Sequence, residues 1–99
     1  MPEYNGSYPG VLKAMIDISD IRKAWWNKKA LLVGISTGRA GNLRGMDQIT
    51  GSLNHMKMTV HYNKLPISVI DKVMDAEGTI TNKSTLQAIE QQVDEFINF

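Results

Sequence analysis

Two glycine-containing loops are the parts of this sequence whose residue types and spacing could do chemistry. The first is Pro2-Glu3-Tyr4-Asn5-Gly6, inside a turn-rich opening segment, and the second is Ser36-Thr37-Gly38-Arg39-Ala40-Gly41. Because glycine has no Cβ, such loops allow backbone N–H groups to approach a planar ring closely. Ligands of open α/β sheets bind beyond the carboxyl ends of the strands, where loops of this kind meet. The two loops are therefore the candidate binding site.

Other groups of residues in the sequence give little indication of catalysis or metal binding. The chain has no cysteine, which excludes disulfides, thiolate catalysis and thiolate metal sites. His55 and His61 have no third ligand nearby, so no metal site is predicted. Within the loops, Tyr4 could line a ligand or pack on the following helix, and Arg39 could bind a phosphate or stay solvated. No catalytic side chain is predicted.

Three helices are expected around these loops. The first runs from about Pro9 to Ser19, and the second follows an N-cap at Asn42 and continues through Leu53, although two glycines weaken it. The third begins at Asn82 or at Ser84, the latter with Gln87 as a capping box. Its apolar stripe consists of Leu86, Ile89, Val93, Phe96 and Ile97.

Strand-like segments alternate with these helices. The run from Ala30 to Ser36 lacks polar alternation and predicts a strand buried on both faces, with Trp25 and Trp26 anchoring the turn before it. Residues 56–61 alternate as an edge strand does, residues 65–70 could be extended, and residues 71–81 form a polar connection. The alternation predicts an α/β sandwich with parallel strands.

The motifs also resemble a known family. Pro2 to Lys13 is similar to the P-E-Y-N-G-S-x-P-G-x-L-K stretch that follows the third strand of NAD(P)H-dependent FMN reductases, which have the flavodoxin-like fold. Ser36 to Gly41 resembles that family's S-x-G-x-x-G-G turn after the fourth strand, except that Asn42 replaces the final glycine. The resemblance covers essentially the whole chain. It implies that residues 1–99 are a single, partial flavodoxin-like three-layer sandwich that lacks the first three strands.

The resemblance also implies a function. FMN would be bound, chiefly through main-chain hydrogen bonds, by Pro2, Glu3, Tyr4, Asn5, Gly6, Ser36, Thr37, Gly38, Arg39 and Gly41. Hydride would pass from NAD(P)H to FMN and then to a flavin, quinone or azo-type acceptor. The family's phosphate-binding loop is absent, so the chain alone is expected to be weak or inactive. The alternative is a non-catalytic assembly or partner-binding module derived from this fold.

The net charge and the expected strand order indicate which partners the chain could have. Eleven Lys and Arg against ten Asp and Glu give a net charge of +1, which provides no field to gather nucleic acid or a membrane surface. Neither a membrane span nor a signal pattern is seen, which predicts a cytoplasmic protein. In the family's 2-1-3-4-5 strand order, the Leu31–Ile35 edge would lose its third-strand neighbour. We therefore expect homo-oligomerisation through this edge, or docking of a separate amino-terminal half.

Overall fold

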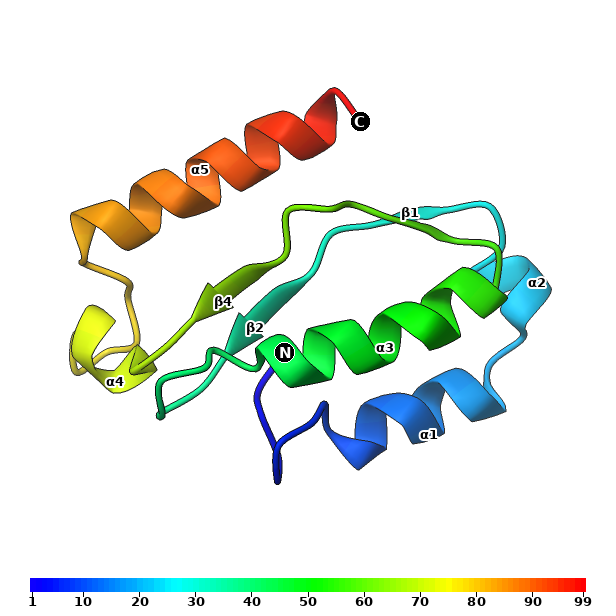
Figure 1. The fold of residues 1–99 in the computed structure, drawn as a ribbon, viewed down its shortest axis with the longest axis horizontal. Coiled ribbons are helices and arrows are strands. Elements are labelled where there is room, and N and C mark those ends of the chain that lie inside the picture. Colours follow the sequence, from blue (N-terminus) through cyan, green and yellow to red (C-terminus); the bar gives the residue numbers. More distant parts are fainter.

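The computed structural model describes residues 1–99 and places two small parallel sheets of two strands each, which together are called the sheet below, between helices (Figure 1). The last helix, α5 (Lys83–Ile97), covers one face of the sheet, while α1 (Gly10–Ile18) and α3 (Leu43–His55) lie on the other. The prediction of a three-layer α/β arrangement with parallel strands is therefore confirmed. None of the helices is long and apolar enough to cross a membrane.

The predicted helices form close to their expected ends. Pro9 caps α1, and Asn42 caps α3 by accepting the Gly45 N–H on Oδ1 at 3.2 Å. At α5, Asn82 Oδ1 accepts the Thr85 N–H at 3.0 Å, and the helix already includes Ser84. The alternative start at Ser84 is therefore wrong, because the Asn82 Oδ1 accepts the amide of the third helical residue and the Ser84 hydroxyl as well.

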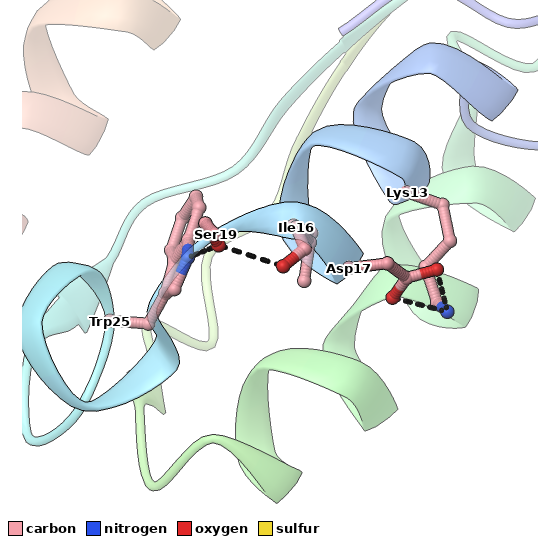
Figure 2. A network of polar contacts seen from close by, with 5 residues as sticks. All are labelled: Lys13, Ile16, Asp17, Ser19 and Trp25. Atoms are coloured by element: carbon pink, nitrogen blue, oxygen red, sulfur yellow. Dashed lines mark hydrogen bonds and ion pairs between the residues drawn. The ribbon is translucent and has the colours of Figure 1, made fainter.

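Two short helices were not predicted. In α2 (Ile21–Ala24), Asp20 accepts the N–H groups of residues 22 and 23, and α4 (Ile70–Val73) interrupts the expected polar connection. Trp25 is hydrogen-bonded to the turn between α1 and α2, rather than to the turn directly before the buried strand, where the tryptophans were expected (Figure 2). Trp25 Nε1 donates to Ser19 Oγ at 2.7 Å, and that hydroxyl donates to the Ile16 carbonyl, also at 2.7 Å.

The buried strand is divided into two pieces. In place of one strand over residues 30–36, β1 (Lys29–Ala30) pairs in parallel with β3 (Thr59–Val60), and β2 (Val33–Ile35) pairs in parallel with β4 (Leu65–Ile67). From Ala30 to Val33 the first segment advances three residues, while its partner advances five, from Val60 to Leu65. The two extra residues lie between β3 and β4 and interrupt the hydrogen bonding between the paired segments. For the same reason, only Thr59–Val60 of the strand predicted over residues 56–61 is formed.

A buried glutamine of α5 bridges this interruption. Gln92 is fully buried, and its Nε2 donates to the carbonyls of Leu32 at 2.9 Å and Asn63 at 2.7 Å. The expected apolar stripe is partly wrong here, because its members at 86, 93 and 97 are exposed. The reason is that α5 meets the sheet where the Asn63 carbonyl has no strand partner, so this position requires a donor. The Leu32 carbonyl already accepts the Leu65 N–H at 3.1 Å, and Gln92 adds a second hydrogen bond to it.

The start of the chain pairs with β2. Ile35 N–H donates to the Met1 carbonyl at 2.9 Å, Glu3 N–H donates to the Ile35 carbonyl at 3.0 Å, and the Met1 ammonium donates to the Val33 carbonyl at 2.9 Å. The expectation of a wholly open Leu31–Ile35 edge is therefore wrong for its second half. The backbone of Leu31 makes no hydrogen bond.

The core lies on the α1 and α3 side of the sheet. Its buried members are Ile16, Ile49, Leu53, Met56 and Met58. Next to it, a hollow of about 540 Å³ opens along the Leu31 edge, walled almost entirely by apolar side chains, including those of Leu12 and Trp25. Because only 15 of the 99 residues are buried, much apolar surface remains at the protein's exterior.

Candidate functional site

The two predicted loops leave the sheet at one point. Pro2 forms a parallel bridge with Ile35, the last residue of β2, so the first loop runs on from Glu3 directly beside the second loop, which begins at Ser36. Both loops therefore lie at the carboxyl end of β2, as expected for a ligand site in an open sheet. The structure brings all ten predicted site residues to this edge.

The first loop closes in a tight turn. The N–H of Tyr4 donates to the Ser7 carbonyl at 2.9 Å, and the N–H of Ser7 donates back at 3.2 Å. Between them, Asn5 and Gly6 have φ values of 52° and 79°, the two positive angles of a type I′ turn, for which Asn-Gly is the preferred pair. Tyr4 is 59% exposed, so it is not buried against α1.

A serine hydroxyl holds the second loop together. Ser36 Oγ donates to the Gly38 carbonyl at 3.0 Å and accepts the Gly41 N–H at 2.9 Å. Gly41 has a φ of 56°, and a Cβ at this position would lie 2.6 Å from the Pro66 Cβ. Only glycine therefore fits at residue 41, where the loop passes against the end of β4.

The backbone of both loops offers unused donors. The N–H groups of residues 37–40 make no hydrogen bond within the chain, nor do those of Asn5 and Gly6. All of these residues except Gly6 are exposed. Six N–H groups around one edge can donate to the acceptor atoms of a planar heterocycle, without any side chain taking part in chemistry.

A third segment at this edge was missed from the sequence. Val69 N–H donates to the Gly38 carbonyl at 2.8 Å, and Ile70 N–H donates to the Ser36 carbonyl at 2.9 Å. Val69 has a φ of 44°, a left-handed conformation that is strained for a β-branched residue. Val69 follows β4, which is parallel to β2, and this position after a parallel strand could have indicated a third loop at the same edge. The sequence pattern of residues 65–70 indicates only an extended segment.

The charged groups at the site do not form an acid–base pair. Glu3 and Arg39 are the only ionisable side chains in the two loops besides Tyr4, and Arg39 is exposed and makes no ion pair. Beneath the first loop, burial lowers the pKa of the Met1 ammonium below its ordinary value of 8.0. No three His, Asp or Glu side chains gather into a metal-binding group. The arrangement is suited to binding rather than to proton transfer.

The three main hollows of the molecule lie away from the two loops. They have volumes of about 420, 540 and 370 Å³, and none is lined by a residue of either loop. The 420 Å³ hollow lies between α1 and the far end of α3, next to the Lys13–Asp17 ion pair (Figure 2).

Comparison with known proteins gives a consistent result. Residues 1–72 match the family model described as NADPH-dependent FMN reductase. The chain is 32% identical over 97 residues to an NAD(P)H-dependent FMN reductase of Pseudomonas aeruginosa, with 93% of this chain and 51% of that protein covered. It is 25% identical over 99 residues to a 2-hydroxy-1,4-benzoquinone reductase of a Burkholderia species, with coverage of 96% and 54%.

A solved structure also matches. The flavoenzyme NAD(P)H:(acceptor) oxidoreductase FerB of Paracoccus denitrificans superposes with a TM-score of 0.81 at 28% identity, over 98% of this chain and 56% of FerB. The chain thus spans about half the length of the relatives it matches.

Proposed function

Because this chain belongs to the NADPH-dependent FMN reductase family, we propose that its two loops bind the isoalloxazine ring of FMN in an NAD(P)H-dependent reductase. The single observation that carries the proposal is the set of six unused backbone N–H groups on residues 5, 6 and 37–40, gathered at the carboxyl end of β2. The ring has carbonyl and ring-nitrogen acceptors along its edge, and these match donors of this kind. The residues present therefore fit the ring.

The role of the chain is to bind and orient. When bound, FMN supplies the redox chemistry by accepting hydride from NAD(P)H and passing electrons to an acceptor of the flavin, quinone or azo class. The Ser36 hydroxyl and Gly41 fix the shape of the second loop, and the Asn5-Gly6 turn fixes the first. The exposed Arg39 guanidinium is available for a phosphate of either nucleotide. No proton-transfer role falls to these residues.

The FMN phosphate requires a site outside these loops. Phosphates are commonly bound by a glycine-rich loop that opens a helix, and the family's loop of that kind does not occur in the 99 residues. The chain by itself is therefore proposed to bind the ring weakly and to have little or no activity. A reducing, cytoplasmic location is proposed as well, because the sequence contains no cysteine.

A second candidate function, partner binding, is favoured by the Leu31 edge. The unpaired Leu31 backbone lies beside the 540 Å³ apolar hollow, in line with the Met1–Glu3 segment that already pairs with β2. An apolar strand running parallel to β1 would pair with Leu31 and fill the hollow. We propose that a separate α/β segment supplies this strand, rather than the edge-to-edge pairing of two copies, since Val33–Ile35 is occupied. Relatives about twice as long support this proposal.

Titration followed by NMR tests the ring site, because it detects weak binding. Added FMN should shift the amide signals of residues 5, 6 and 37–40, whereas inorganic phosphate at the same concentration should leave those of Asn5 and Gly6 unchanged. Ser36→Ala removes the hydroxyl that shapes the second loop and should weaken the FMN response, while Ser52→Ala, beside the distant 420 Å³ hollow, should not. Shifts centred on that hollow, or none at millimolar FMN, would contradict the proposal.

Light scattering tests the partner proposal. An added apolar strand peptide should form a complex with the chain, and Leu31→Lys should abolish this complex because a charge opposes strand pairing at the edge. Exposed Val11, at 76% exposure on the outer face of α1, provides the matched control as Val11→Lys. A stable 11.1 kDa monomer that takes up no apolar strand peptide would rule the partner proposal out.

A further inference from the structure

Asn42 contacts the first loop from beneath. Its side chain is fully buried, and its Nδ2 donates to the Pro2 carbonyl at 2.9 Å and to the Met1 carbonyl at 3.3 Å. Its Oδ1 accepts the Gly45 N–H as the cap of α3. A single carboxamide therefore satisfies one helix amide and two carbonyls that lie about forty residues away in sequence.

The same face of α3 receives the rest of the loop. A Cβ on Gly45 would lie 2.7 Å from the Tyr8 backbone nitrogen, so the loop can pass here only over a glycine. One turn further along, the Gln48 Oε1 accepts the Ser7 hydroxyl. Residue 42, the N-cap of α3, and residues 45 and 48 of the helix are spaced three apart, and residues 1–8 pack against this face.

The backbone of Asn42 explains why a glycine would not be equivalent. Its φ of 58° is left-handed, a conformation that glycine adopts freely and asparagine tolerates. A glycine would keep this conformation but would lose both donors to the first loop. Asn42 also follows Gly41 directly, at the end of the second loop, so it belongs to one loop and bonds to the other.

We propose that Asn42 is a positioning residue that fixes the first candidate loop against the second through its Nδ2 hydrogen bonds. The coupling between the loops follows from contacts within the chain alone. Its consequence for FMN rests on the proposed function, because a ring bound across both loops needs their spacing to be constant. Asn42 does not touch the ring in this scheme.

Asn42→Asp separates the two roles of the residue. Aspartate is as good a helix cap as asparagine, but it has no Nδ2 and turns an anionic oxygen toward the Met1 and Pro2 carbonyls. Hydrogen-exchange protection at the amides of Glu3 and Ile35, which pair the chain start with β2, should fall about tenfold or more. Protection at Gly45 should persist, because the cap acceptor remains.

Asn82→Asp is the matched control, since Asn82 caps α5 in the same way and bonds to no distant loop. It should leave the Glu3 and Ile35 amides unchanged. Unchanged protection in Asn42→Asp would overturn the proposal. If that variant does not fold, Gln48→Ala should still increase hydrogen exchange at the Tyr4 and Ser7 amides. The absence of an increase would equally contradict the packing of residues 1–8 against α3.

FMN provides a separate readout. In Asn42→Asp, the FMN-induced shifts at Asn5 and Gly6 should disappear, while those at residues 37–40 should persist, a split that general destabilisation would not produce. If the exchange effect occurs but no variant responds to FMN, the positioning role stands and the proposed function fails. If both FMN responses persist unchanged while exchange rises, the loops bind the ring independently and Asn42 does not position it.

Discussion

The two halves of the predicted strand differ in how their backbone groups are satisfied. β2 is paired on both sides, by β4 and by the Met1–Glu3 segment, and it carries both candidate loops. β1 is paired only with β3, and the Leu31 backbone that follows it is unpaired beside an apolar hollow. The half next to the candidate loops has backbone partners on both sides, whereas the other half has a backbone partner on one side only.

The largest effect on stability is expected from the close backbone packing around β2. A Cβ on Gly34 would lie 2.2 Å from the Gly41 carbonyl oxygen and 2.9 Å from the Met46 side chain. Gly34→Ala should therefore cost about 2 to 4 kcal/mol in the free energy of unfolding, measured by urea denaturation. Gly38→Ala is the control, because its Cβ would meet nothing within 4 Å, and its effect should stay within about 1 kcal/mol. Equal effects would show that β2 is not tightly packed.

The junction between the halves should be the next most sensitive position. Gln92→Ala leaves the Asn63 carbonyl without a donor and the Leu32 carbonyl with only the Leu65 N–H, and should lower the unfolding free energy by about 1 to 3 kcal/mol. The neighbouring Gln91 is exposed and bonds only to Glu95, so Gln91→Ala should cost less than about 0.5 kcal/mol. Indistinguishable midpoints for the two variants would mean that the carbonyls find other partners.

The smallest expected effect concerns the Met1 ammonium. Burial lowers its pKa, so below pH 8.0 the folded state binds fewer protons there than the unfolded state, and stability should rise as pH increases through the window that ends near 8.0. The gain should be only a fraction of 1 kcal/mol, since the group is partly exposed. Acetylation of the amine should remove this dependence. A fall in stability across the same window would contradict the assignment.

Sequence patterns sufficed wherever a structure depends on neighbouring residues. The turn-rich opening segment, the cap at Asn42 and the two glycine loops each follow from a few adjacent residues, and Asn82 was one of the two caps that the sequence offered for α5. The family resemblance was carried by the same short motifs and is confirmed by the match over residues 1–72. The parallel α/β class followed from the alternation of segments, which is also a local property.

Patterns failed where residues distant in sequence meet. Nothing near Gln92 indicated that the Asn63 carbonyl would need its carboxamide, because the need arises from a register shift between two strands. The pairing of Met1–Glu3 with β2 was missed for the same reason. The strained Val69 lies in a segment with no local turn signal, and its conformation is imposed by contacts with the second loop.

The sequence by itself determined the two loops, the approximate positions of the three long helices and the family. Tertiary structure alone decided that the loops leave from one point, that Asn42 joins them and that the strand edge stays open only near Leu31. The physical reason is the range of the interactions. Turns and caps are closed by amides three or four residues apart, whereas the spacing of the loops depends on hydrogen bonds across about forty residues, which exist only once the sheet and α3 have packed.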